Sequence, residues 1–260
     1  EPHVGVEIDV TANTDIDTYE SHQQVNFAVN YSGYAVSNPT TDFKYIVQQN
    51  RRWDTHVSNL RPTLMQVNKL IFNHNRGLIF TAGNEYRRFE ILDEDVPTMH
   101  IDRVFYDDPY YHAVLYADEQ RINYLYDQDQ NGRYFVRNDE DWENDTESDY
   151  IMTHFTLQMP QAPGGDVYLF GDFTDNRIDE AYKMEYNLID HQYELITPLK
   201  QGSYNYMYLF KGEDDTIGET RPCEGDFHQT ENEYCVYVYH RPFGLRYDKL
   251  VGFQKINYKE

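Results

Sequence analysis

Apolar residues alternate with polar or small residues along most of this chain of 260 residues. Positions 4–10, 25–31 and 43–47 each carry an apolar residue at every second position. Because successive side chains of a strand point to opposite faces, this period of two predicts half-buried β-strands. The same pattern predicts further strands at 70–72, 78–80, 87–92, 101–106, 113–116, 124–127, 134–136, 151–159, 167–170, 193–196, 204–210, 234–239 and 250–253.

One turn signal separates two of these predicted strands. Asn131-Gly132 lies between the runs at 124–127 and 134–136. An Asn-Gly pair between alternating runs is a strong hairpin signal, because both residues tolerate positive φ. Many short strands divided by turn signals are typical of β-sandwiches. We therefore expect an all-β protein with a hairpin at this turn.

An acidic segment suggests where the chain divides. Residues 139–149 include seven acidic residues and no basic residue. Like charges repel one another and rarely occupy a packed element, so we interpret this segment as a connector. The sequence thus predicts a β-sandwich domain over residues 1–145, ending in the acidic connector, and a second β-sandwich over residues 146–260.

The chain is strongly acidic, with 45 acidic and 22 basic residues and a formal net charge of −23. Such a charge repels phosphate backbones and anionic lipid surfaces, so no nucleic-acid partner is expected. We interpret the acidity as a solvated surface, with a cation site or a basic partner as alternatives. No apolar run approaches the roughly 18 residues of a membrane span, so no direct membrane insertion is expected. No signal peptide is recognised either.

Motifs of enzymes are missing from the sequence. It has no nucleophile elbow, no His-Glu-x-x-His and no Walker loop, and its ten His residues are scattered singly. We therefore expect a binding protein rather than an enzyme. A glycoside-active enzyme stays a minor alternative, since acidic residues are too numerous to single out one catalytic pair.

Oxygen-bearing side chains at alternate positions suggest one metal site. Asp127, Asp129 and Asn131, followed by Gly132, match the first half of a calcium-binding loop. The twelfth position of such a loop is normally Glu, but here it is Asn138. The acidic residues 139–141 could replace it. Calcium is the one candidate cofactor, and a plain hairpin turn is the alternative.

Two cysteines, Cys223 and Cys235, are twelve positions apart. One close pair is compatible with a disulfide in an oxidising compartment. The alternative is a buried thiol on the strand at Cys235 and a loop thiol at Cys223.

Tyrosines provide the candidate partner-binding residues. Tyr204, Tyr206 and Tyr208 share one face of a predicted strand and could form an aromatic platform. The alternative is that they fill a sandwich core. Tyr110 and Tyr111 follow Asp107-Asp108-Pro109 in a predicted loop, where binding residues are common. We expect these two tyrosines to contact a partner.

Five segments, read in order, resemble a known family. Residues 50–54, 72–90, 200–206, 229–234 and 241–244 are similar to the Bacteroidota family of proteins related to the type IX secretion system plug protein. The resemblance implies export to the periplasm and a further β-domain before the point where this chain begins. It also implies an outer-membrane β-barrel secretion channel as partner, since the family's best-described member closes the periplasmic mouth of such a channel. It implies no catalytic residues.

A second resemblance concerns the fold of the C-terminal half. Residues 166–176, together with 200–210, resemble the early-set immunoglobulin-like fold of starch- and glycogen-binding modules. Such modules usually have a sugar-stacking Trp where this chain has Asp175-Asn176. We therefore expect two immunoglobulin-like sandwich domains in a non-enzymatic periplasmic interaction protein. A carbohydrate-binding accessory protein that uses the second domain is the alternative.

Overall fold

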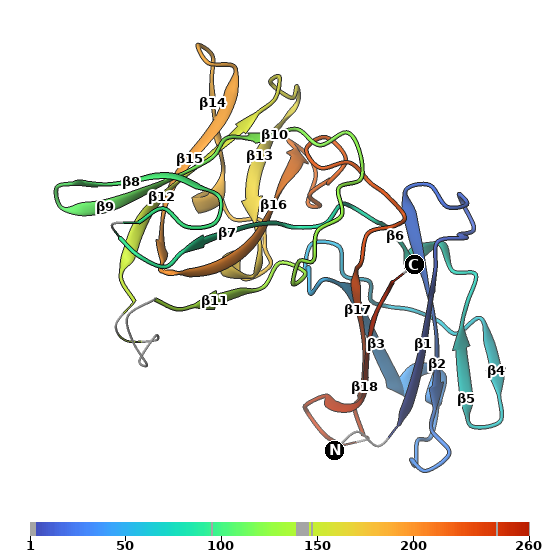
Figure 1. Ribbon diagram of the computed structural model, residues 1–260. Helices are drawn as coiled ribbons and strands as arrows, with labels where there is room; N and C mark the ends of the chain where they lie inside the picture. Colours follow the sequence, from blue (N-terminus) through green and yellow to red (C-terminus); the bar gives the residue numbers. More distant parts are fainter. Residues whose placement is uncertain (1–3, 95, 139–145, 147, 243, 260) are drawn as a thin grey trace. The chain divides into compact units, whose positions relative to one another are not determined.

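The computed structural model describes residues 4–94, 96–138, 146, 148–242 and 244–259. Strands arranged in four sheets dominate its regular secondary structure (Figure 1), which confirms the predicted all-β class. Among these residues, no helix is long and apolar enough to cross a membrane. The helical segments are short: α1 (Pro39–Asp42) and the 3-10 turns Arg76–Leu78, Asp172–Thr174 and Glu180–Tyr182.

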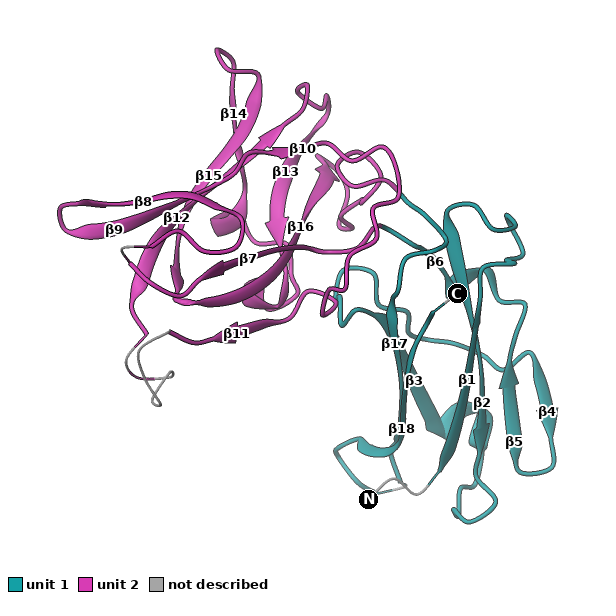
Figure 2. Ribbon diagram, in the orientation of Figure 1, with its two compact units in different colours: residues 1–83, 226–260 teal, residues 84–225 magenta. Residues whose placement is uncertain are grey.

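The chain divides into two compact units, coloured separately in Figure 2. Unit 1 comprises residues 1–83 and 226–260, and unit 2 comprises residues 84–225. The predicted domains 1–145 and 146–260 are therefore wrong. The reason is a long-range pairing, since β17 (Glu233–His240) runs antiparallel to β3 (Phe43–Gln49) and so completes the first unit with the end of the chain.

Unit 1 contains two sheets around one apolar core. Phe27 and Phe72 stack with ring centroids 4.2 Å apart, and Tyr45 from the opposite sheet meets Phe72 edge-on at 4.6 Å. Aromatic pairs of these geometries add to the free energy gained from burial. The first sheet comprises β1 (Gly5–Thr11), β2 (His22–Asn30), β4 (Leu64–Gln66), β5 (Lys69–Phe72) and β6 (Ile79–Thr81). The second comprises β3, β17 and β18 (Lys249–Asn257).

Unit 2 is built in the same way from a larger pair of sheets. Phe89, Phe155 and Tyr206 meet edge-on in its core, with each pair of ring centroids 5.4 Å apart. The six-stranded sheet comprises β8 (Ile101–Asp107), β9 (Tyr110–Leu115), β10 (Asp118–Glu119), β12 (Tyr150–Gln158), β14 (Glu185–Asn187) and β15 (Gln192–Lys200). The four-stranded sheet comprises β7 (Arg87–Ile91), β11 (Tyr134–Val136), β13 (Gly165–Phe170) and β16 (Gly202–Gly212).

The predicted hairpin around Asn131-Gly132 does not form. Residues 124–127 are not a strand, and β11 pairs with β16 instead. Side chains bind the backbone N–H groups that a hairpin would need, since Leu125 donates to Asn84 Oδ1 and Asn131 donates to Asp129 Oδ1. Such local bonds from Asn and Asp compete with ladder formation.

Candidate binding surface on unit 2

The outer face of the six-stranded sheet follows from the alternation along β12. Ile151, Thr153, Phe155 and Leu157 are buried in the core. The residues between them therefore point to the other side of the sheet. The antiparallel register with β15 places His154 opposite Ile196 and Thr156 opposite Glu194 on this outer face. A sequence with a regular period of two thus presents polar side chains on a rigid scaffold.

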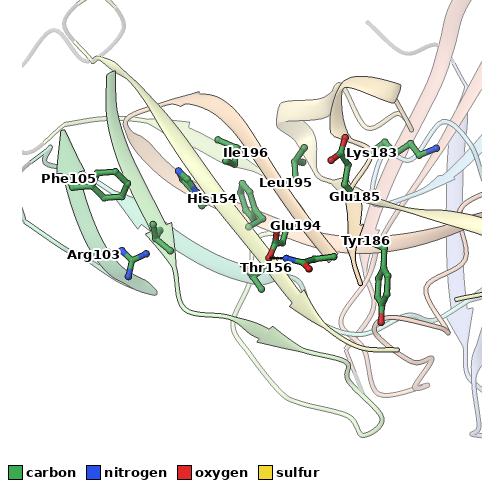
Figure 3. A pocket seen from close by; sticks show the side chains of 13 residues that line it. Arg103, Phe105, His154, Thr156, Lys183, Glu185, Tyr186, Glu194, Leu195 and Ile196 are labelled. Atoms are coloured by element: carbon green, nitrogen blue, oxygen red, sulfur yellow. Dashed lines mark hydrogen bonds between the residues drawn. The ribbon is translucent and has the colours of Figure 1, made fainter. Parts of the chain in front are cut away.

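This outer face holds an open groove of about 750 Å³, shown in Figure 3. Its lining mixes hydrogen-bonding, charged and apolar side chains, among them Arg103, Phe105, His154, Thr156, Glu194 and Ile196. An open groove across several strands suits an extended or large ligand better than an enclosed small molecule.

Two histidines from adjacent parallel strands hydrogen-bond beside this groove. His112 Nδ1 on β9 and His154 Nε2 on β12 are 2.8 Å apart. The ring centroids are 5.1 Å apart. The centroid distance is close to the sum of the N···N distance and the two ring radii. The two nitrogens therefore lie nearly on the line that joins the ring centres, as in a well-directed hydrogen bond. One nitrogen then donates and the other accepts, which requires at least one neutral imidazole. Phe105 stacks on His112 at 5.0 Å and 10°.

Charge and burial favour neutral His154. Burial, followed by the nearby His112 and Arg103, lowers the pKa of His154 below its usual value. Glu194 accepts from Asn187 Nδ2 at 3.2 Å and from Gln192 Nε2 at 2.5 Å, so protein donors already hold this carboxylate. The groove is thus a set of positioned donors and acceptors around one stacked Phe–His pair.

The β8–β9 hairpin borders this face and carries exposed aromatic side chains. Tyr106 and Tyr110 are 56% and 54% exposed, and Phe105 is 39% exposed. Tyr111 is half-buried and meets Tyr106 edge-on, with ring centroids 5.1 Å apart. The predicted contact residues Tyr110 and Tyr111 therefore lie at the start of a strand beside a two-residue turn, with Tyr110 free to meet a partner.

The predicted aromatic platform of Tyr204, Tyr206 and Tyr208 does not exist. Their side chains do share a face of β16, but that face is the core, and their exposed fractions are 2%, 0% and 0%. The opposite face of β16 is buried as well, at Met207 and Leu209. These three tyrosines therefore cannot contact a partner, and the core alternative holds.

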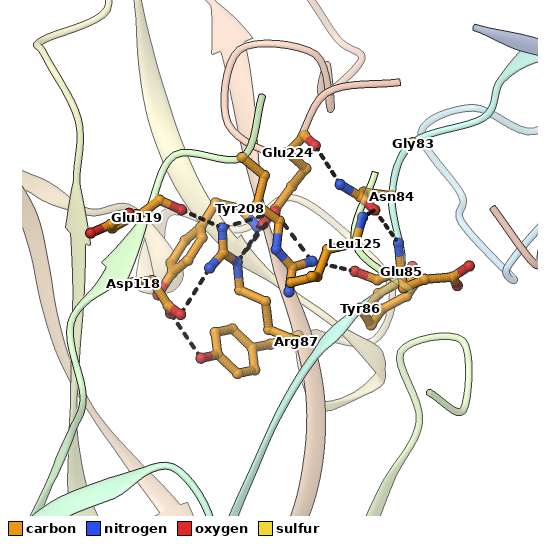
Figure 4. Close-up of polar contacts among 12 residues, drawn as sticks. Gly83, Asn84, Glu85, Tyr86, Arg87, Asp118, Glu119, Leu125, Tyr208 and Glu224 are labelled. Carbon is orange, nitrogen blue, oxygen red and sulfur yellow. Dashed lines mark hydrogen bonds and ion pairs between the residues drawn. The ribbon is translucent and has the colours of Figure 1, made fainter. Parts of the chain in front are cut away.

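Two of those tyrosines belong to a buried ionic network, drawn in part in Figure 4. Asp118 accepts hydrogen bonds from the hydroxyls of Tyr206 and Tyr208, at 2.8 and 2.7 Å. Arg87 binds the same carboxylate at 2.8 Å and Glu224 through three contacts of 3.0 to 3.2 Å. Each charge is paired and hydrogen-bonded, as a buried ion requires. Arg87 thus serves the core, whereas the neighbouring Arg88 forms a partly exposed ion pair with Asp127.

Two of the three proposed calcium ligands, Asp127 and Asp129, are bound to protein groups, whereas the buried Oδ1 of Asn131 has no hydrogen-bond partner among the described residues. Both carboxylate oxygens of Asp127 accept from Arg88, at 2.6 and 3.0 Å. Asp129 accepts from the backbone N–H groups of Asn131 and Tyr86. Burial raises the pKa of Asp129 to about 6. Within the described residues no three His, Cys, Asp or Glu side chains gather to hold a metal, and calcium binding at this loop stays a prediction. The proposed substitutes at 139–141 lie outside the described residues.

The predicted disulfide is not formed. Cys223 and Cys235 are both free and buried. Cys223 belongs to unit 2, whereas Cys235 lies on β17 in unit 1, so they are held in different units. The alternative of one strand thiol and one loop thiol is correct.

Sequence reasoning missed the histidine pair and the stacked Phe105. His112 and His154 are 42 positions apart and meet through the parallel pairing of β9 with β12. No spacing rule marks such a pair. The outward positions of the strand at 151–159 carried the one available signal, because His154 is one of the residues that alternate with its buried ones.

Fold and site together define an all-β protein of two units, each with two sheets packed around an apolar core, and with an open sheet face as the candidate site. A crystal structure of a hypothetical protein from Parabacteroides merdae is similar to this chain, with a TM-score of 0.95 and 45% sequence identity. The similarity covers 99% of this chain and 66% of that chain, so this chain spans just under two thirds of its length. Comparisons with known protein families and with curated proteins give no match.

Proposed function

We propose that this chain is part of a non-enzymatic periplasmic interaction protein that docks to an outer-membrane β-barrel secretion channel. The observation that carries the proposal is the open outer face of the six-stranded sheet with exposed Phe105, Tyr106 and Tyr110 at its border. Exposed aromatic residues next to polar groups are typical of protein interfaces. The family resemblance of the five segments supports the choice of a secretion channel as partner.

The acidic surface would contribute orientation and speed rather than most of the affinity. The net charge of −23 favours partners with basic patches and raises the rate of encounter with them. Aromatic anchors that become buried on docking would supply most of the binding energy. Tyr110 is the anchor that we place first, because it is exposed and lies beside the rigid turn of a hairpin.

Co-purification with the channel barrel tests this proposal. We expect the combined Tyr110→Ala and Tyr111→Ala variant to lower recovery of the barrel at least tenfold, a loss of about 1.4 kcal/mol. Tyr247→Ala is the matched control, since Tyr247 is 57% exposed and lies in unit 1. Unchanged recovery with the double variant would refute the hairpin contact. Recovery of no outer-membrane barrel by the wild-type protein would refute the proposed partner.

A carbohydrate-binding role is the second candidate. The surface that supports it is the groove, since the tyrosines first predicted to stack on sugar are buried. Phe105 stacked on His112 offers an aromatic surface, and Arg103, Thr156 and Glu194 offer donors and acceptors for sugar hydroxyls. A glycan array would test the carbohydrate-binding role: binding should fall with Phe105→Ala, and an array without signal would exclude it.

We also propose that both units are immunoglobulin-like and that unit 2 is of the early-set type.

A further inference from the structure

The edge of the six-stranded sheet at β8 is open. In the part of the chain that the structure describes, the sheet order β14-β15-β12-β9-β8 leaves one side of β8 without a neighbour. A bulge lies between Ile101 and Arg103, but the five residues from Arg103 to Asp107 pair regularly with β9. A regular open edge presents backbone N–H and C=O groups to another strand.

The hairpin geometry shows which residues present these groups. Asp108 and Pro109 form a two-residue turn between the paired residues Asp107 and Tyr110. In such a tight hairpin the closing pair is hydrogen-bonded, and bonded and non-bonded pairs then alternate. Arg103, Phe105 and Asp107 therefore bond to β9. Val104 and Tyr106 direct their N–H and C=O groups outward.

We propose that β8 pairs with β8 of a second copy of this chain, antiparallel and around a two-fold axis at Phe105. In this register Val104 of each copy lies opposite Tyr106 of the other, which satisfies the outward groups of both. Arg103 of each copy lies opposite Asp107 of the other, on the same face as Phe105. Every contact occurs twice, as a two-fold interface requires.

The charges on β8 favour a second copy of this chain as the pairing partner, and they favour this register. The side chain of Arg103 is 66% exposed, and its Nη1 lies 3.9 Å from Oδ2 of Asp102, a long ion pair. Opposite charges across antiparallel strands stabilise the pairing, and like charges destabilise it. A shift of two residues would place Phe105 opposite Arg103 or Asp107 and lose both ion pairs. A shift of one residue would place the outward N–H and C=O groups of one copy opposite residues of the other copy whose N–H and C=O groups already bond to β9.

The predicted dimer is weak, because one pair of edge strands buries much less than the roughly 1,200 Å² of a standard stable interface. It would join two six-stranded sheets into one continuous sheet, with both outer grooves on the same side. The inference is independent of the proposed docking to a channel, since it concerns the isolated protein.

A charge swap tests the pairing by sedimentation velocity over a wide range of protein concentrations. Arg103→Asp and Asp107→Arg each create two like-charge pairs, so each should raise the dissociation constant by about tenfold or more. The combined variant restores two opposite-charge pairs and should dimerise like the wild-type protein. A wild-type chain that stays monomeric up to millimolar concentration, or a combined variant as weak as the single ones, would overturn the inference.

A second pair of variants separates strand pairing from side-chain contact. Tyr106→Pro removes an outward N–H without removing a bond to β9, and Pro is tolerated at such edge positions. Tyr106→Ala removes the ring and keeps the N–H. We expect the Pro variant to abolish dimerisation and the Ala variant to retain most of it, with both keeping the wild-type thermal transition. Equal loss in both folded variants would show that the contact is not a strand pairing.

Discussion

Each unit buries a layer of polar side chains, and the two layers differ in charge. In unit 1 the layer around Asn232 consists of amides and hydroxyls, and a buried ion pair also joins Arg52 to Asp54 at 2.6 Å. Asn232 donates to Gln23 Oε1 at 3.0 Å and to the Ala82 carbonyl at 2.8 Å, and it accepts from Asn50 Nδ2 at 2.6 Å. In unit 2 the corresponding layer is ionic, with Arg87 between Asp118 and Glu224 (Figure 4). The same architecture therefore tolerates a neutral network and a charged one.

The difference predicts how each unit responds to change. A neutral amide network depends on geometry alone, and the loss of one member leaves orphaned donors and acceptors. An ionic network also carries the desolvation cost of its charges, so the loss of one partner leaves an uncompensated buried charge. The buried thiols provide a separate reporter for each unit. Burial raises the pKa of the Cys223 and Cys235 thiols, so labelling requires opening of the unit that holds each one.

The largest effect is expected from Arg87→Met. This change removes the main cation of both carboxylates and leaves Glu224 with Arg121 at 3.7 Å and Asp118 with His100 at 3.3 Å. It should lower the free energy of unfolding of unit 2 by about 3–5 kcal/mol. Pulsed thiol labelling across a urea gradient should show Cys223 reacting at lower urea, with Cys235 unchanged. Arg88→Met is the control, because the side chains of Arg88 and Asp127 are about one third exposed and their ion pair is worth at most about 1 kcal/mol. An equal shift at both cysteines would show that the units unfold together.

A smaller effect on the other unit is expected from Asn232→Ala. The change leaves Gln23, Asn50 and the Ala82 carbonyl each without one partner, which should cost unit 1 about 2–3 kcal/mol. Here Cys235 should react at lower urea and Cys223 should not. Asn205→Ala, which removes a side chain that accepts from the Gln130 N–H in unit 2, provides the reversed pattern as a control. No change at Cys235 would mean that the amide layer contributes little.

Local structure was predictable from the sequence, whereas long-range pairing was not. The alternation at 25–31 and 43–47 predicted β2 and β3 to within a few residues. It could not show that β3 pairs with β17 almost 190 residues later, as in the pair Val47 and Val236. The acidic segment at 139–149 was therefore mistaken for a domain boundary. Composition locates chain segments that pack poorly, but domain boundaries depend on which strands pair.

The candidate site was predicted only in part, for a related reason. Period two correctly placed Tyr204, Tyr206 and Tyr208 on one face, but it does not tell a core face from a solvent face when both faces of a strand are buried. Tyr110 could be predicted as exposed because the turn before it is local. The groove around His154 depends on strand order, which the sequence pattern does not contain.

The smallest and most specific effect is expected from acid. Burial raises the pKa of Asp118, but His100 at 3.3 Å, the charge of Arg87 and the hydrogen bond from Tyr208 outweigh it, so this pKa is lowered on folding. A carboxylate with a lowered pKa contributes its full stability above the pKa of the unfolded chain, about 3.9, and loses it as the pH falls toward the lower folded value. Acidification below about pH 4 should therefore lower the urea midpoint for Cys223.

Asp118→Asn separates this effect from the general response to acid. The variant is destabilised at neutral pH, but it has no carboxylate to titrate at this position, so its Cys223 midpoint should change less between pH 5 and pH 3 than that of the wild-type protein. The Cys235 midpoint should respond to acid equally in both proteins, because Asp118 lies in unit 2 and Cys235 lies in unit 1. If Asp118→Asn leaves the acid response of Cys223 unchanged, the charges of the network do not govern the stability of unit 2.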